Sequence, residues 1–283
     1  MTSATWSPLG HVASGDLGPA RLTLHYAAQP LAAAAYALLP MREDHSHSNL
    51  LWSAERRGFV GRPLSSEQRL FLDPAALRIG LLAASGEESA VIELHGKTLA
   101  QAFTELAALL TGNGGDVPAA GLKLPEYDLP DSPLADAATF TVDAPALTEL
   151  AHWYHDADQA LSAVTTELLG DAELRVWPHH FDVAALLTLD QDKEPEFARS
   201  IGAGFSPGDG SYDEPYLYIS PWPAPAPDAL PPLPEGARWH TTGFTSAVVT
   251  GTALVEGGDA DSQHARALAL VEGCVDACLE VLG

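Results

Sequence analysis

Two histidines stand two residues apart in the segment Glu43–Asn49, which leads into an expected strand. Side chains at i and i+2 of an extended chain point to the same side, so His45 and His47 could together hold a metal. The segment could equally be an exposed polar loop, because a lone His-x-His motif is a weak signal. His47 and Asn49 are therefore candidate ligand-binding residues, and His47 is also a candidate metal ligand.

The segment Val176–Asp182 places two imidazoles, a carboxylate and two aromatic rings ahead of another expected strand. His180 and Asp182 are two apart and would share a face in extended geometry. A carboxylate beside a histidine can fix its tautomer or share a metal with it. Alternatively, these polar groups satisfy backbone groups at a strand entrance. His180 and Asp182 are candidate catalytic groups and metal ligands, and Trp177 is a candidate ligand contact.

A glycine-rich segment, Gly202–Gly210, precedes a further carboxylate. No lysine follows it, so it is not a Walker-type phosphate loop. Glycines let the backbone approach a ligand closely, which makes Phe205 a candidate ligand contact, but the pattern also fits a β-turn centred on Pro207–Gly208. Glu214 precedes a proline and is therefore held extended at the mouth of a strand, where it is a candidate catalytic carboxylate.

Other histidines fall on expected helices or strands. His25 and Gln29 are four apart on a helix, face together beside its apolar stripe, and are candidate ligand-binding residues. His152 and His155 lie three apart on a later helix, where we interpret both as a solvated flank. His240 precedes the last expected strand and is a further candidate metal ligand.

The positioning elements follow from apolar periodicity, which predicts helices at both ends of each half of the chain. The helices are expected at about 24–38, 98–110, 144–169 and 261–282, with a kink or a helix restart at Pro30 and a capping box at Thr98. Strands are expected at 49–53, 77–82, 90–94, 174–177, 183–189, 216–220 and 245–251. Consecutive strands with helices at the ends argue for an α+β fold with mostly antiparallel sheet. A doubly wound α/β fold would need regular strand–helix alternation.

The same order of elements occurs twice, which predicts two pseudo-equivalent helix–strands–helix halves at residues 1–115 and 140–283. Residues 116–139 are rich in proline and glycine and are expected to connect the halves. The terminal helices are apolar over too wide an arc for one half to cover, so we expect both halves to pack as one compact body. A second irregular stretch, Pro221–Pro234, is predicted to be an extended surface loop.

Composition excludes several classes of partner. Lys plus Arg is 14 against 38 for Asp plus Glu, giving a formal net charge of -24. Such a surface repels phosphate backbones and anionic lipid, so neither nucleic acid nor a membrane is expected as a partner. No apolar run reaches the roughly 18 residues of a membrane span, and Met1–Gly18 lacks the features of a signal peptide. Cys274 and Cys278 are expected to be reduced core residues of a cytoplasmic protein.

Four motifs together resemble a bacterial family of unknown function. They are Trp177-Pro-His-His-Phe-Asp182, Gly204-Phe-Ser-Pro-Gly-Asp209, Glu214-Pro-Tyr-Leu-Tyr218 and Trp239-His-Thr-Thr-Gly-Phe244. The helix containing His25 and the segment from His47 to Trp52 fit the same family, so the resemblance covers roughly residues 18–252. It implies kinship and no particular activity. Seven residues match the polar motif positions of the family: His25, Gln29, His47, Asn49, His180, Asp182 and Glu214.

Polar and aromatic residues at strand mouths favour a protein that binds or acts on a small molecule in a polar cleft between the halves. One alternative is a metal-dependent hydrolase with Glu214 as the base that activates water. Its divalent metal would be held by two or three of the following: His47, His179, His180, Asp182 and His240. Another alternative is a non-catalytic protein that docks a partner on Pro221–Pro234. For any such site, we predict that Trp177–Asp182, His47 and Glu214 converge.

Overall fold

The computed structural model describes the chain except for residues 1–4, 65–66, 170–172, 195–196 and 257. It has the predicted α+β architecture, with helices and two antiparallel sheets. Its internal contacts divide it into two units, which are described separately. Unit 1 comprises Met1–Asp16, His152–Leu174 and Asp182–Gly283, and unit 2 comprises Leu17–Ala151 and Arg175–Phe181. The expectation that the two halves form one compact body stays a prediction.

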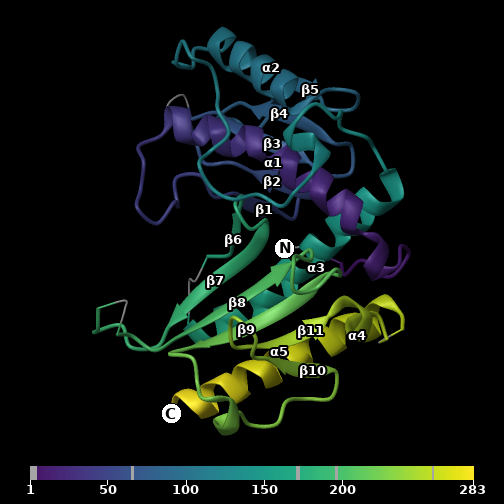
Figure 1. The fold of residues 1–283 in the computed structure, drawn as a ribbon, viewed down its shortest axis with the longest axis vertical. Coiled ribbons are helices and arrows are strands. Elements are labelled where there is room, and N and C mark those ends of the chain that lie inside the picture. Colours follow the sequence, from purple (N-terminus) through teal and green to yellow (C-terminus); the bar gives the residue numbers. More distant parts are fainter. Residues whose placement is uncertain (1–4, 65–66, 170–172, 195–196, 257) are drawn as a thin grey trace. The chain divides into compact units, whose positions relative to one another are not determined.

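Unit 2 contains a five-stranded antiparallel meander in the order β1-β2-β3-β4-β5 (Figure 1). Helices α1 and α2 pack against each other, with α1 on β3 and α2 on β5. Its elements are α1 (Gly18–Leu38), β1 (Leu51–Ser53), β2 (Gly58–Val60), β3 (Arg69–Asp73), β4 (Arg78–Leu82), β5 (Glu88–Glu93), α2 (Leu99–Gly112) and the 3-10 helix η2 (Pro133–Ala135). The sequence did not indicate β2 or β3, since neither alternates apolar and polar residues.

Helix α2 begins and ends much as the periodicity predicts, whereas α1 ends as predicted but begins at Gly18, before the expected start at residue 24. Helix α1 runs unbroken through Pro30, where a kink or restart was expected. At the start of α2, the Thr98 hydroxyl accepts the backbone N–H of Gln101 at 3.2 Å, and the Gln101 side chain accepts the backbone N–H of Thr98 at 2.8 Å. This is the predicted capping box, which satisfies two N–H groups that the helix leaves unpaired.

Residues 116–139 lie within unit 2 and do not link the two units. The hydroxyl of Tyr127 donates to Gln29 Oε1 of α1 at 2.6 Å, and Tyr26 of α1 donates to the carbonyl of Pro130 at 2.9 Å. This proline-rich segment therefore folds back on α1. Turn-forming residues show where helices and strands stop, and they do not show which body the segment joins.

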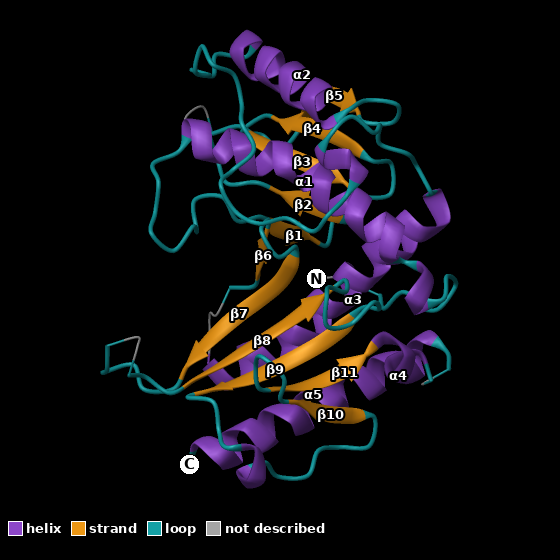
Figure 2. Ribbon diagram, in the orientation of Figure 1, coloured by secondary structure: helices purple, strands orange, loops and turns teal. Residues whose placement is uncertain are grey.

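Unit 1 is built on a sheet in the order β10-β11-β9-β8-β7-β6 (Figure 2). The last strand in this order, β6 (Arg175–Trp177), belongs to unit 2, where Val176 is bridged to Leu50. The other elements are the 3-10 helix η1 (Ser14–Asp16), α3 (Ala144–Leu169), whose first residues belong to unit 2, β7 (Asp182–Thr188), β8 (Ser200–Ser206), β9 (Tyr216–Trp222), η3 (Pro227–Ala229), β10 (Ala237–His240), β11 (Ser246–Thr250), α4 (Gly251–Val255) and α5 (Ala260–Leu282).

One face of this sheet forms the core of unit 1. The register aligns Val183, Phe205 and Leu217 on that face. The ring of Phe205 is fully buried, lies parallel to Trp153 of α3 with centroids 6.2 Å apart, and meets Tyr154 edge-on at 5.2 Å. Phe205, a candidate ligand contact in the sequence, is thus a core residue. It was proposed as a ligand contact because glycines surround it in the sequence, and these glycines are part of strand β8.

The segment read as a glycine-rich loop is in fact largely the central strand β8. The phenol ring of Tyr218 on β9 lies across Gly204, because a Cβ built at Gly204 would overlap that ring. Glycine is required here for close packing between strands. Similarly, the first residues of the predicted surface loop, Pro221 and Trp222, are the end of β9.

Two helices of unit 1 bury polar or titratable side chains: cysteines on α5 and a histidine on α3. Cys274 and Cys278 on α5 are free and fully buried, as predicted, and burial raises the pKa of each thiol to about 12. His155 on α3 is only 2% exposed, so the interpretation of a solvated flank was wrong for it. Within the described residues, no helix combines the length and apolar character needed to cross a membrane.

Candidate functional site

The loop that carries the Trp177–Asp182 motif is fastened to α1 by two predicted site residues. His25 Nε2 donates to the carbonyl of Pro178 at 2.9 Å, and Gln29 Nε2 donates to the same oxygen at 3.0 Å. The His25 ring stacks on Phe181, with centroids 5.2 Å apart and planes 11° apart. His25 and Gln29 face together as predicted, and what they hold is a backbone carbonyl of their own unit.

Burial sets the charge of His25, which is 5% exposed. Desolvation lowers the pKa of this imidazole to about 4, and the bond to Pro178 offsets only part of that effect. The ring is therefore neutral at pH 7, with its proton on Nε2, where it donates to the carbonyl. Such a group anchors a loop without adding charge to it.

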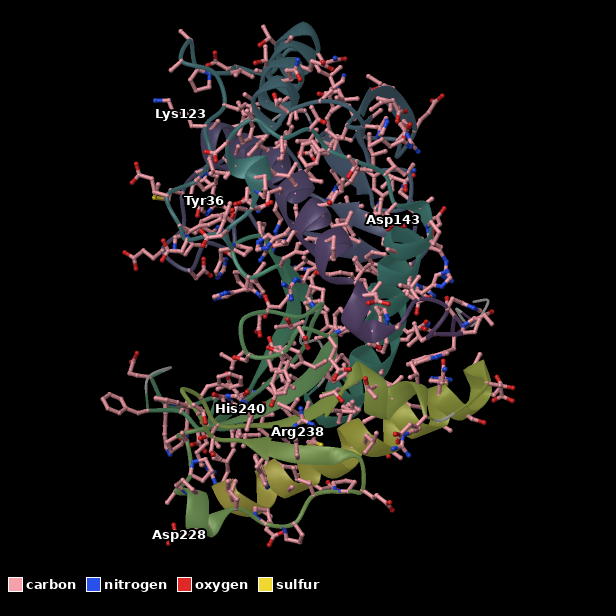
Figure 3. The ribbon with its side chains drawn as sticks, turned by 45° about the vertical axis from the view of Figure 1, so that its right-hand side comes forward. Tyr36, Lys123, Asp143, Asp228, Arg238 and His240 are labelled. Carbon is pink, nitrogen blue, oxygen red and sulfur yellow. The ribbon has the colours of Figure 1, made fainter. Side chains whose placement is uncertain are left out.

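Seven rings of unit 2 form what we name the ring cluster: Tyr36, His45, His47, Tyr127, Trp177, His179 and His180. Tyr36, labelled in Figure 3, meets His47 edge-on at 4.5 Å, and its hydroxyl lies 2.8 Å from Nδ1 of His45. The ring centroids of His179 and His180 are 4.2 Å apart. The two histidine-bearing segments of the sequence therefore meet in space, through residues well over a hundred positions apart.

The imidazoles of the ring cluster do not form a metal centre in the described residues. No group of three or more His, Cys, Asp or Glu side chains in that part of the chain is placed to hold a metal ion. Burial, followed by the repulsion of His180 and His45, lowers the pKa of His179 to about 4. His180 is exposed. The neutral ring of His179 thus lies among aromatic neighbours, Tyr127 and Trp177.

A cavity of about 300 Å³ lies beside the ring cluster, and His47 belongs to both. Its lining residues are Leu39, Pro40, Arg42, Ser46, His47, Arg62 and Pro63. His47 is 4% exposed, and its Nδ1 accepts the backbone N–H of Arg42 at 3.3 Å. Burial, followed by the charge of His45, lowers the pKa of His47, so the neutral ring carries its proton on Nε2.

One donor of this cavity has no acceptor. His47 Nε2 is buried and makes no hydrogen bond within the part of the chain that the structure describes. Asn49, only 1% exposed, accepts Nε of Arg62 at 2.8 Å, and the carbonyl of Ser46 accepts the same N–H at 3.2 Å. The predicted residue Asn49 therefore positions a guanidinium at the cavity.

The predicted carboxylates lie in unit 1, and each accepts hydrogen bonds there. Asp182 accepts the hydroxyl of Tyr218 at 2.5 Å. Glu214 accepts the backbone N–H of Thr252 at 2.7 Å and its hydroxyl at 2.6 Å. Burial and the Asp182 charge raise the pKa of Tyr218 well above its usual range, so this hydroxyl keeps its proton. A threonine at the start of α4 thus provides both donors to Glu214.

His240 also has partners within unit 1, on β10 (Figure 3). Its Nε2 donates to the carbonyl of Thr242 at 2.7 Å, so Nδ1 is free to accept the hydroxyl of Tyr212 at 3.0 Å. Phe244 stacks on the imidazole at 4.1 Å, and Arg238 lies over the Tyr212 ring. Both ring nitrogens are engaged, which leaves His240 without a free nitrogen for the metal proposed from the sequence.

The structure brings some predicted site residues together and assigns others to different units. His25, Gln29, His47, Asn49, Trp177 and His180 belong to unit 2, whereas Asp182, Phe205, Glu214 and His240 belong to unit 1. The predicted convergence of His47 and His180 with Glu214 concerns residues of both units, and it stays a prediction. The residues predicted from the sequence did not include Tyr36, Tyr127, Arg42, Ser46 or Arg62. For Arg42 a signal existed: it lies directly before the histidine segment in a chain with only 14 basic residues.

Comparison of the chain with protein-family models, curated proteins and solved structures found no match.

Proposed function

We propose that this protein binds a small molecule in unit 2, at the cavity lined by His47 and beside the ring cluster. The observation that supports the proposal most strongly is the buried Nε2–H of His47, which has no acceptor in the described residues and borders a cavity of about 300 Å³. A buried donor left unpaired costs about 1–3 kcal/mol. A ligand oxygen in the cavity would remove that cost.

The surroundings of His47 suit a binding site with one polar and one apolar side. Arg42, Ser46 and Arg62 supply donors on the cavity side. On the other side, Tyr36 meets the imidazole edge-on and continues into the ring cluster. Concave sites with a few convergent polar groups and an aromatic wall are typical of small-molecule binding.

Binding, with no chemical step assigned, is the better-supported form of this proposal. Asp182 and Glu214, the candidate catalytic carboxylates, accept hydroxyl hydrogens from Tyr218 and Thr252 and so have a role in holding unit 1 together. His180, the third candidate, is an exposed member of the ring cluster, where it would contact a ligand.

Two further proposals come from the sequence. Kinship with the bacterial family of unknown function is supported by the four combined motifs. Operation in the cytoplasm is supported by two free, buried cysteines, which a reducing compartment maintains.

Thermal-shift screening of the full chain against a panel of central metabolites tests the proposed function. A ligand at 100 times its dissociation constant stabilises the folded state by about 2.7 kcal/mol. We expect at least one compound to raise the melting temperature of wild type and of the unit 1 control His240→Phe, and not of His47→Leu. A ligand that stabilises His47→Leu as much as wild type, or a panel with no stabilising compound, would contradict the proposal.

A further inference from the structure

We propose that the group recognised in the His47 cavity is the phosphate of a small phosphate monoester, held by Arg42, Ser46, His47 and Arg62. The inference rests on the proposed function, because it names the chemical class of ligand for the same site. It is argued from the donors, the local charge and the size of the cavity.

The polar side chains that line the cavity offer hydrogens and few acceptors. Arg62 has its Nε held by Asn49 and the Ser46 carbonyl, which fixes the guanidinium while its Nη groups make no hydrogen bond within the described residues. The guanidinium of Arg42 likewise has no ion pair or side-chain hydrogen bond to the residues that the structure describes. Guanidinium donors in a fixed planar arrangement match the oxygens of phosphate and carboxylate groups.

His47 adds a neutral donor with a defined tautomer. Because Nδ1 accepts the Arg42 backbone N–H, the hydrogen of the neutral ring is on Nε2, where a ligand oxygen can accept it. The Ser46 hydroxyl is a further polar group of the lining. A metal cation would meet two guanidinium charges and an imidazole N–H here, so the lining selects an anion.

The charge around the cavity is positive although the chain as a whole is strongly negative. Burial, then the charges of Arg42 and Arg69, lowers the pKa of Arg62, and burial together with Arg62 lowers that of Arg175 to about 10. Asp44 is the carboxylate that opposes this repulsion at Arg62. Cations that destabilise one another's charge gain from an anion placed among them.

A phosphate group fits these donors better than a carboxylate. The lining offers the two guanidinium groups of Arg42 and Arg62 and the buried Nε2–H of His47. A phosphate monoester presents three acceptor oxygens, one for each of these groups, whereas a carboxylate presents two. The cavity volume of about 300 Å³ exceeds that of a phosphate ion, which leaves room for an organic group.

The test is titration calorimetry of the full chain with inorganic phosphate, with phenyl phosphate and with acetate. We expect phenyl phosphate to bind more tightly than phosphate, and acetate to bind at least tenfold more weakly than phosphate. Arg42→Gln and Arg62→Gln should each weaken phosphate binding at least tenfold. The control Arg238→Gln removes the same charge from unit 1 and should leave binding unchanged.

Arg42 is exposed, so Arg42→Gln should keep the wild-type melting temperature even if Arg62→Gln, which loses the bonds to Asn49, does not. Equal binding of acetate and phosphate, or unchanged phosphate binding by Arg42→Gln, would overturn the inference. If the metabolite panel yields a His47-dependent ligand that phosphate does not displace, the proposed function stands and the phosphate assignment fails. If no ligand depends on His47, both fail.

Discussion

Unit 1 and unit 2 place the same kinds of polar residue in opposite situations. In unit 1, Asp182 accepts the hydroxyl hydrogen of Tyr218 on β9, and Glu214 accepts that of Thr252 on α4. In unit 2, His47 presents a buried donor to a cavity, and no described residue accepts from it. All these residues stand near the ends of strands in the sequence, so position alone does not separate them.

The difference shows what marks a candidate site: a buried hydrogen-bond donor or acceptor that has no partner within the fold. A buried polar group that already has its partner is part of the fold, because removing the partner would cost the desolvation of the group left behind. A buried donor that faces a cavity can still form a bond with a ligand. By this criterion His25 and Gln29 of unit 2 belong with the carboxylates of unit 1, because they hold the Pro178 carbonyl.

The largest effect should come from filling the space that Tyr218 occupies over β8. Gly204→Ala places a methyl group inside the Tyr218 ring, so the ring must move and its bond to Asp182 is disturbed. We expect a loss of about 3 kcal/mol in the free energy of unfolding, measured by urea denaturation. If Gly204 serves only the packing of this sheet, ligand binding in unit 2 should be unaffected in the variant that remains folded.

Gly202→Ala is the matched control for that substitution. It lies two residues earlier on the same strand, where a Cβ would meet Ser220 at an ordinary 3.8 Å. We expect a change of less than about 1 kcal/mol, as for a surface strand position. In a Tyr218→Ala background, Gly204→Ala should also become nearly neutral. Equal losses at both glycines would show that strand propensity, and not the Tyr218 ring, explains the effect.

The second effect concerns the imidazole that fastens α1 to the motif loop. His25 has a pKa of about 4 in the folded protein and about 6.5 when unfolded, so the unfolded state binds more protons between these values. The contribution of His25 to the free energy of unfolding is therefore fully present above pH 6.5 and is lost as the pH falls toward 4. This group alone should remove about 2 kcal/mol of unfolding free energy between pH 7 and pH 5.

His25→Gln is the informative variant, because glutamine can still donate to the Pro178 carbonyl but does not titrate. Urea denaturation at pH 7, 6 and 5 should show a smaller loss of stability for His25→Gln than for wild type. His179, which also has a pKa of about 4, is present in both proteins and cancels in the comparison. Parallel pH profiles for the two proteins would mean that His25 is not a buried neutral anchor.

The sequence was sufficient for the fold class and for part of the site. Apolar periodicity and the Thr98 capping box predicted the helices, because a helix is stabilised by contacts at i, i+3 and i+4 that the local sequence records. The strand β8 was missed, since Gly204 is explained by Tyr218, a residue on another strand. The sequence marked Asn49 only as a polar residue and did not indicate that it holds a guanidinium. Its partner Arg62 lies 13 residues away, beyond two strands whose pairing the local pattern did not indicate.

The smallest effect distinguishes a carboxylate of the fold from one of the site. Glu214→Gln keeps the shape of the side chain but weakens the hydrogen bonds from Thr252 at the start of α4, since a neutral amide oxygen accepts less strongly than a carboxylate. We expect a loss of about 1 kcal/mol in unfolding free energy, and phosphate binding within a factor of two of wild type. The control is Asp213→Asn, which removes the same charge from an exposed neighbour and should change neither quantity. Thermal denaturation and calorimetry on the same samples measure both. If Glu214→Gln abolished phosphate binding while remaining folded, Glu214 would belong to the site, as the predicted convergence with His47 requires, and the division of roles between the two units would be wrong.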